Sequence, residues 1–136
     1  MKTDFLNAFD RHKMDADTLF INQRLGNAGQ LYGLAAECGL KVLMIEFGMQ
    51  MNNEAPVDNN DKVHADKVWS RYQIYQSGYV NGSNYALSDN NPFSSWSIHQ
   101  RYWSDNDIDQ LDIEMFKNGA TQVENMIKRA KIDGLL

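Results

Sequence analysis

A polar stripe runs along the most apolar segment of the chain, residues 27–49. If this segment is a helix, Gln30, Glu37 and Lys41 lie within about 40° of one line along it, because successive residues turn by about 100°. A charge buried among apolar side chains needs a partner, since an unpaired one is costly or loses its charge. Lys41 is the i+4 neighbour of Glu37, in the favourable orientation, and Arg101 is a second candidate partner.

His99 and Arg101 are a second group that could do chemistry. They occupy alternate positions of an aromatic-rich segment, so an extended backbone would place both on one face. A histidine can act as a general acid or base, and an arginine can stabilise phosphate charge. Three interpretations stay open: a structural network that fixes helix register, a small binding or catalytic pocket, or plain surface exposure. The network would comprise Gln30, Glu37, Lys41 and Arg101, and the pocket Glu37, Lys41, His99 and Arg101.

The remaining reactive side chains form no familiar motif. The three histidines are scattered, and no histidine and cysteine spacing typical of a metal site occurs. His12 falls in an apolar helical stripe, where we expect a structural histidine, and His64 is expected to be exposed near the start of a helix. Cys38 belongs to the apolar stripe of residues 27–49, and neither a glycine-rich phosphate loop nor a GxSxG motif is present. We therefore expect no metal and no cofactor.

Length and composition favour one ordinary globular domain over residues 1–136. Hydrophobic residues make up 43% of the chain and charged residues 23%, which is not the composition of a disordered protein. The formal net charge of −5 opposes the long-range attraction that drives most nucleic-acid binding. A local basic patch could still engage RNA.

The apolar segments and the single cysteine bear on the compartment. Cys38 cannot form an intramolecular disulfide, and residues 1–13 lack the apolar core of a secretory signal. Residues 31–49 approach the length of a bilayer span, but Glu37, Lys41 and Glu46 interrupt them. We expect a buried core helix, no membrane and a cytoplasmic protein.

Apolar residues that recur at three- and four-residue steps predict four long helices. They cover residues 3–23, 27–49, a stretch from near Ala65 to Gly78, and residues 107–132. Thr3 is expected to cap the first helix and Gly26 to end it. Residues 50–62 should form an exposed loop and residues 79–103 a long connection. The predicted fold is all-α, an up-down four-helix bundle with room for a fifth short helix.

The segment from Ala28 to Met44, preceded by Asp15, Ala16 and Arg24, resembles the second helix of HEPN-domain proteins. The typical pattern there is an aromatic residue, small residues, and then Glu-Cys-x-Leu-Lys. A later Trp96 and the run from Gln100 to Tyr102 add weaker support. The residues that match most closely are Tyr32, Ala35, Ala36, Glu37, Cys38, Leu40 and Lys41.

The resemblance implies a helical bundle, commonly a homodimer, of prokaryotic toxin–antitoxin and phage-defence systems. Many HEPN proteins are ribonucleases, and others are non-catalytic partners of nucleotidyltransferases. The catalytic members carry an Arg-x4-6-His motif, whose two residues meet their copies across the dimer. No histidine follows an arginine at that spacing in this chain, and His99 precedes Arg101 in the reverse order.

Three functions follow as hypotheses. The first is a non-catalytic HEPN-like module that acts through dimerisation or by binding a protein or nucleotide partner, with a nucleotidyltransferase as one candidate. The second is a divergent HEPN-type ribonuclease that uses His99 and Arg101. The third is a small-molecule enzyme that uses Glu37 and Lys41, which requires a pocket open to solvent at the polar stripe.

Overall fold

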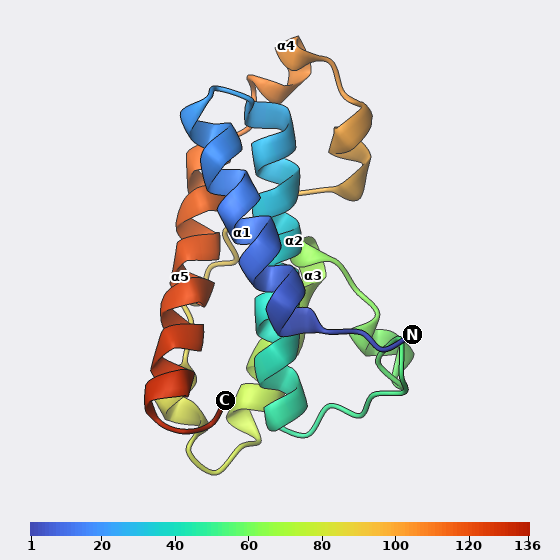
Figure 1. The fold of residues 1–136 in the computed structure, drawn as a ribbon, viewed down its shortest axis with the longest axis vertical. Helices are drawn as coiled ribbons and strands as arrows, with labels where there is room; N and C mark the ends of the chain where they lie inside the picture. The colour runs from blue at the N-terminus through green and yellow to red at the C-terminus, as the bar shows by residue number, and fades with distance from the viewer.

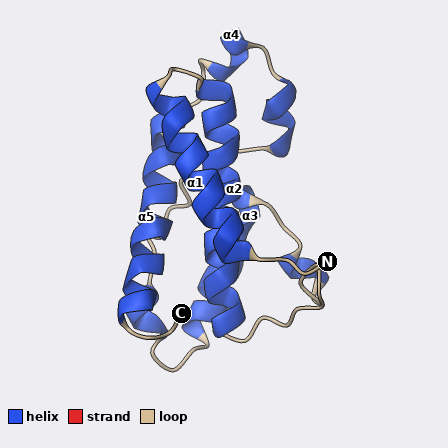
Figure 2. Cartoon of the chain, in the orientation of Figure 1, coloured by secondary structure: helices blue, strands red, loops and turns tan.

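The chain is built from helices and turns, with no strand (Figure 2). The computed structural model describes all 136 residues. The only β-type pairing is an isolated bridge between Met51 and Pro56. The predicted all-α class is therefore confirmed. The helices are α1 (Phe5–Ile21), α2 (Leu25–Glu46), α3 (Ala65–Ser77), α4 (Asp105–Ile108) and α5 (Ile113–Ile132), with short 3-10 turns η1 (Asn59–Asp61), η2 (Gly82–Tyr85) and η3 (Ile98–Tyr102).

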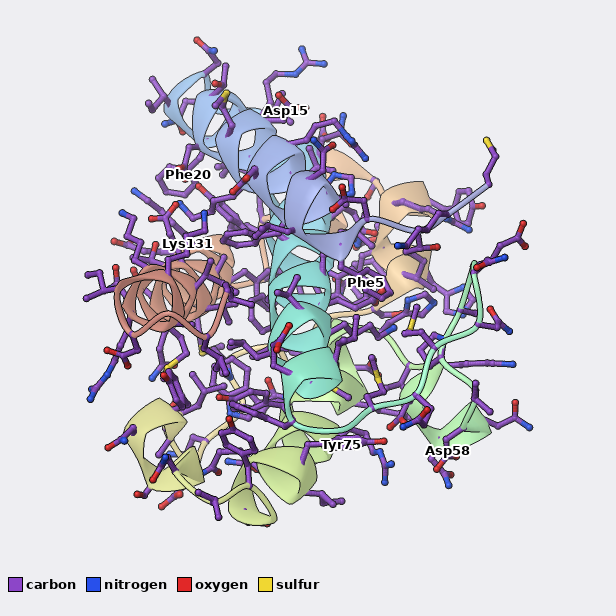
Figure 3. The ribbon with its side chains drawn as sticks, turned by 60° about the horizontal axis from the view of Figure 1, so that its bottom comes forward. Phe5, Asp15, Phe20, Asp58, Tyr75 and Lys131 are labelled. Carbon is purple, nitrogen blue, oxygen red and sulfur yellow. The ribbon has the colours of Figure 1, made fainter.

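Helix α2 is the centre of the bundle. It packs against α1, α3 and α5, and also contacts η3 and α4 (Figure 1). Side chains of the neighbouring elements surround it in Figure 3. Because α2 is apolar on almost every side, it loses little by being enclosed and brings large side chains into the core. None of the helices combines the length and the apolar composition needed to cross a bilayer.

Gly33 of α2 allows a close approach of the loop that precedes η3. A Cβ atom at this position would overlap the indole nitrogen of Trp96. In the structure the Trp96 Nε1–H instead donates to the carbonyl of Gly29 at 3.0 Å, and the Trp96 side chain is almost fully buried. The packing of this indole offsets the cost of a glycine inside a helix.

Helix α1 differs from the prediction at both of its ends. Asp4, not Thr3, caps α1, and its carboxylate accepts from the Asn7 N–H at 3.0 Å. Gly26 lies inside α2 and does not end α1. The left-handed position is taken by Gln23, with φ of 59°, so the chain reverses three residues earlier than a glycine signal suggests.

The last helix was expected to run without a break over residues 107–132. The structure contains a single turn, α4, and then a new helix, α5, that starts at Ile113. The Asp112 carboxylate accepts from the Met115 N–H at 3.0 Å and so caps α5. The apolar seam predicted for this helix does face the core, with Ile113, Phe116, Ala120, Val123, Ile127 and Ala130 all buried.

The polar loop before α3 was predicted to be exposed, but it contains a fully buried carboxylate. Asp61 has no exposed surface. Its Oδ1 accepts from Arg71 Nε at 2.9 Å and its Oδ2 accepts from the Tyr75 hydroxyl at 2.5 Å. These bonds fasten the loop to α3, because a buried carboxylate is tolerated only when it is paired and hydrogen-bonded.

The close contact at Gly33 generates a stability prediction. Gly33→Ala should lower the free energy of unfolding by about 2 kcal/mol, because the methyl group forces the Trp96 indole out of its site. Urea denaturation followed by circular dichroism measures the change.

Gly26→Ala is the matched control in the same helix. A Cβ atom there would sit 3.5 Å from the Ile108 side chain, an ordinary contact. It should leave stability unchanged or raise it by up to about 1 kcal/mol. Equal losses for the two variants would show that the overlap with the Trp96 indole is not what determines the effect, because helix propensity alone favours alanine at both positions.

Candidate functional site

The polar stripe of α2 faces the two connections that lead into α3 and η3. Gln30 Nε2 donates to the Ser97 carbonyl at 2.8 Å, and Lys41 Nζ donates to the Val63 carbonyl at 3.0 Å. Both polar side chains are buried, with exposed fractions of 8% for Gln30 and 5% for Lys41. Each therefore exchanges water for a backbone acceptor of a connecting segment, and each holds that segment against the helix.

Glu37 lies between two partners. Its Oε2 is 3.5 Å from Lys41 Nζ, and its Oε1 is 2.9 Å from His64 Nδ1. Only 12% of the Glu37 side chain is exposed. The contact with Lys41 joins the two residues at the i+4 spacing noted in the sequence. The bond to His64 joins the stripe to the first residue before α3, and it was not expected.

His64 is a half-exposed histidine with one engaged nitrogen. It occupies the N-cap position of α3, and 53% of its side chain is exposed. The Trp96 ring lies beside it, with 6.2 Å between ring centres. When the ring is neutral, a carboxylate at Nδ1 requires the proton to be on Nδ1 and leaves Nε2 as an acceptor.

The structure does not bring His99 and Arg101 to this cluster. Residues 98–102 form the 3-10 turn η3 and not an extended strand, so Gln100 points inward while His99 and Arg101 are exposed. The Arg101 guanidinium stacks on the ring of Tyr102, 4.8 Å from its centre. Arg101 is thus not the partner of Glu37. The expectation of an extended backbone is wrong, because residues 98–102 form a 3-10 turn, although His99 and Arg101 are both exposed.

Arg101 instead lines a hollow at one end of the bundle. The hollow has a volume of about 470 Å³ and lies between the α1–α2 turn, η3 and α4, at the top of Figure 1. Two arginines and two aspartates line it, namely Arg24, Arg101, Asp105 and Asp109. Trp103 also lines the hollow and is 45% exposed. Its neighbour in the chain, Tyr102, is 74% exposed. We call Arg24, Arg101, Tyr102 and Trp103 the η3 surface.

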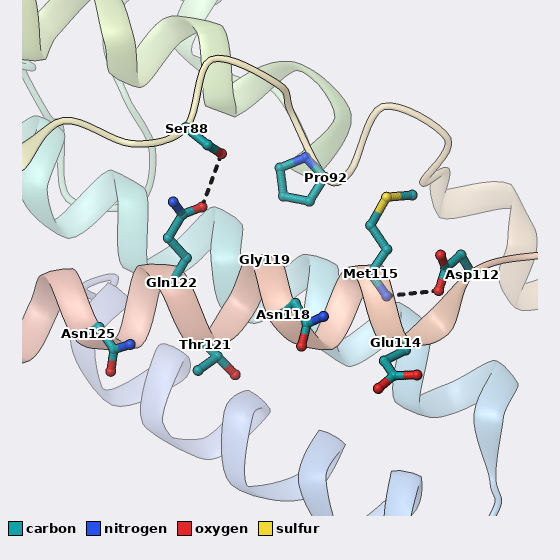
Figure 4. A pocket seen from close by; sticks show the side chains of 10 residues that line it. All are labelled: Ser88, Pro92, Asp112, Glu114, Met115, Asn118, Gly119, Thr121, Gln122 and Asn125. Carbon is teal, nitrogen blue, oxygen red and sulfur yellow. Dashed lines mark hydrogen bonds between the residues drawn. The ribbon is translucent and has the colours of Figure 1, made fainter.

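A second, wider groove runs along α5 beneath the loop at Ser88 and Pro92 (Figure 4). Its lining is polar, and its ionisable groups are the carboxylates of Asp112 and Glu114. Asp112 already caps α5. No histidine, cysteine, lysine or arginine lines the groove.

One buried ion pair was missed by the sequence reasoning. Lys13 of α1 is 6% exposed, and its Nζ lies 2.7 Å from Asp17 Oδ2 and 3.8 Å from Glu124 Oε2. The Tyr32 hydroxyl donates to Asp17 Oδ1 at 2.7 Å. Burial works to raise the pKa of Asp17, but the bonds from Lys13 and Tyr32 outweigh it and lower that pKa. The cluster joins three helices and leaves no group free for chemistry.

Burial shifts the pKa of two further reactive residues. Burial and the nearby Arg11 lower the pKa of His12, which is half-buried in α1. Burial, followed by the charge of Glu37, raises the pKa of Cys38 to about 12. No three side chains among histidine, cysteine, aspartate and glutamate are placed to hold a metal ion.

Comparison with known proteins finds no matching family model, no matching curated protein and no matching solved structure. The HEPN resemblance therefore rests on the motif in α2. Most of that motif is core: Tyr32, Ala35, Ala36, Cys38 and Leu40 are buried. Its two charged residues form the Glu37–Lys41 pair.

Lys41→Met tests the energetic weight of the stripe. Methionine keeps most of the volume but leaves the Val63 carbonyl without a donor and Glu37 with only His64. We expect the free energy of unfolding to fall by about 2 kcal/mol in urea denaturation. The control is Lys128→Met, which removes an exposed i+4 partner of Glu124 at 3.7 Å and should cost less than about 0.5 kcal/mol. Similar small losses of stability for both variants would mean that Lys41 does not hold the segment before α3 against α2.

The raised pKa of Cys38 makes a simple reactivity prediction. The thiol stays protonated and buried at pH 8, so the folded protein should not react with Ellman's reagent, and one thiol should react once urea unfolds the chain. Rapid reaction of the native protein would contradict the buried position of Cys38.

Proposed function

We propose that the chain is a non-catalytic HEPN-like module that acts through a bound partner, and that the partner is a second copy held at the η3 surface. The observation that carries the proposal is the exposure of Tyr102 and Trp103 beside Arg101. Tyrosine, tryptophan and arginine are the residues that most often dominate binding energy at protein interfaces. A toxin–antitoxin or defence setting is the context in which such modules act.

The η3 surface is held rigidly from behind. Gln100 is buried and its Nε2 donates to the Ser95 carbonyl at 2.7 Å. Gln30 of α2 holds the Ser97 carbonyl, and Trp96 is anchored to Gly29. A partner therefore meets side chains whose backbone is already ordered, which lowers the entropic cost of association.

The charges at this end suit self-association. Arg24 and Arg101 share the hollow with Asp105 and Asp109. In a two-fold dimer each copy presents the same patch to the other, so a patch that holds both signs can match basic groups of one copy with acidic groups of its partner. The mixed charge suits a second copy better than the phosphate backbone of a nucleic acid.

The divergent ribonuclease is the alternative. It would use His99 as the acid or base and Arg101 to stabilise phosphate charge, and both are exposed on the same turn. The His99 ring makes no hydrogen bond that would orient it; only its backbone N–H is bonded, to Ser97 Oγ at 3.1 Å. Catalytic histidines are usually held by a second group, so the geometry favours the binding module.

Sedimentation velocity tests the proposal. The wild-type protein should sediment as a dimer, and Tyr102→Ala with Trp103→Ala should raise the dissociation constant at least about tenfold while leaving the circular dichroism spectrum of the folded chain unchanged. The control is Val80→Ala, which removes a side chain of 92% exposure outside the η3 surface and should dimerise normally.

A wild-type protein that stays monomeric at all concentrations, or a double variant that dimerises as tightly as wild type, would contradict the dimer at this surface. The same samples incubated with RNA test the alternative. Cleavage by wild type that His99→Ala abolishes would establish the ribonuclease.

A further inference from the structure

The proposed module does not use the half-exposed imidazole that is bonded to a nearly buried carboxylate. His64 is half exposed, its Nδ1 is bonded to Glu37 Oε1 at 2.9 Å, and Glu37 is 12% exposed. No protein group bonds to the other ring nitrogen, Nε2. None of these residues belongs to the η3 surface.

The position of the imidazole is fixed from two sides. Glu37 holds the ring, and Lys41, 3.5 Å from Glu37 Oε2, also donates to the carbonyl of Val63, the residue before His64. The bond from Lys41 to the Val63 carbonyl already holds this segment on α2, and the bonds from Arg71 and Tyr75 to Asp61 hold it on α3. The bond from Glu37 to the ring is therefore not needed to position the backbone, and its specific effect is on the imidazole.

That effect is to make Nε2 a nucleophile. A carboxylate that accepts from Nδ1–H selects the tautomer whose lone pair is on Nε2, and it stabilises the positive charge that the ring gains when Nε2 forms a bond. The same logic activates imidazoles that are oriented by carboxylates in catalytic triads.

The surroundings of His64 suit an incoming phosphoryl group. The positive end of α3 follows it directly. The exposed Lys62 and Lys67 lie two residues before it and three residues after it in the chain, and the single acid of the first turn of α3 is Asp66. A phosphoryl group carries about two negative charges, which a helix N-terminus and lysines stabilise.

We propose that His64 is a phosphoacceptor, modified at Nε2 by a small activated phosphoryl donor such as a phosphoramidate or an acyl phosphate. The Nε2 lone pair attacks phosphorus, the bond between phosphorus and the leaving group breaks, and the leaving group departs with that electron pair. The Nδ1 proton stays between the ring and Glu37, whose charge balances the ring. The protein is the substrate of this step, so the proposal is independent of the binding function.

Phosphoramidate labelling with peptide mass spectrometry tests the proposal, because this donor modifies histidine without an enzyme. His99 is an internal control in the same molecule, since it is exposed but has no carboxylate partner. We expect His64 to be labelled faster than His99. Glu37→Gln should lower the labelling rate of His64 about tenfold. This is the low end of the loss in affinity or activity seen when a metal-binding histidine loses the group that orients it. The rate at His99 should not change.

Phosphorus on Nε2, assigned by NMR of the labelled protein, is the expected product, and His64→Asn should remove the label. An unchanged melting temperature of Glu37→Gln would show that its slower labelling is a chemical effect and not a result of unfolding. If that variant unfolds, the ratio of the labelling rates of His64 and His99 in the wild-type protein still tests the proposal. Equal rates at the two histidines, or phosphorus on Nδ1, would overturn the proposal. Loss of dimerisation in Tyr102 and Trp103 variants would not affect these rates, so the two proposals fail separately.

Discussion

The enclosure of α2 is the constraint on which the rest of the structure depends. A helix surrounded by three others cannot leave an amide, a carboxylate or an ammonium group unpaired. The partners of Gln30, Glu37 and Lys41 come from the connections before α3 and η3, and not from another helix. No buried side-chain nitrogen or oxygen lacks a hydrogen bond. The irregular segments are therefore as much part of the core as the helices.

Both candidate surfaces follow from this arrangement. The η3 surface is presented by a turn that Gln30 and Trp96 fasten to the first half of α2, and His64 is presented by a segment that Lys41 and Glu37 fasten further along it. One stripe thus positions the aromatic residues proposed to bind a partner and the imidazole proposed to accept a phosphoryl group. The side chains of the stripe hold two segments in place, and both proposed surfaces lie on those segments.

Local patterns in the sequence predicted the local structure. Three- and four-residue periodicity found the long helices within a few residues at most ends, and i+4 spacing found the contact between Glu37 and Lys41. The bond from Glu37 to His64 joins residues 27 positions apart, and no local pattern reports such a pairing. Asp61 was missed because a polar loop does not reveal that one carboxylate turns inward. The break before α5 was missed although the apolar seam itself begins only at Ile113, where α5 starts.

Hydrogen exchange at the tryptophan indoles tests the central claim most directly. The Trp96 N–H donates to the Gly29 carbonyl inside the contact at Gly33, whereas Trp103 is 45% exposed and its indole makes no hydrogen bond in the protein. If the connections are docked on α2 as described, the Trp96 N–H should exchange only when the whole protein unfolds, orders of magnitude more slowly than that of Trp103. Similar exchange rates for the two indoles would show that the segment before η3 opens locally and is not held on α2.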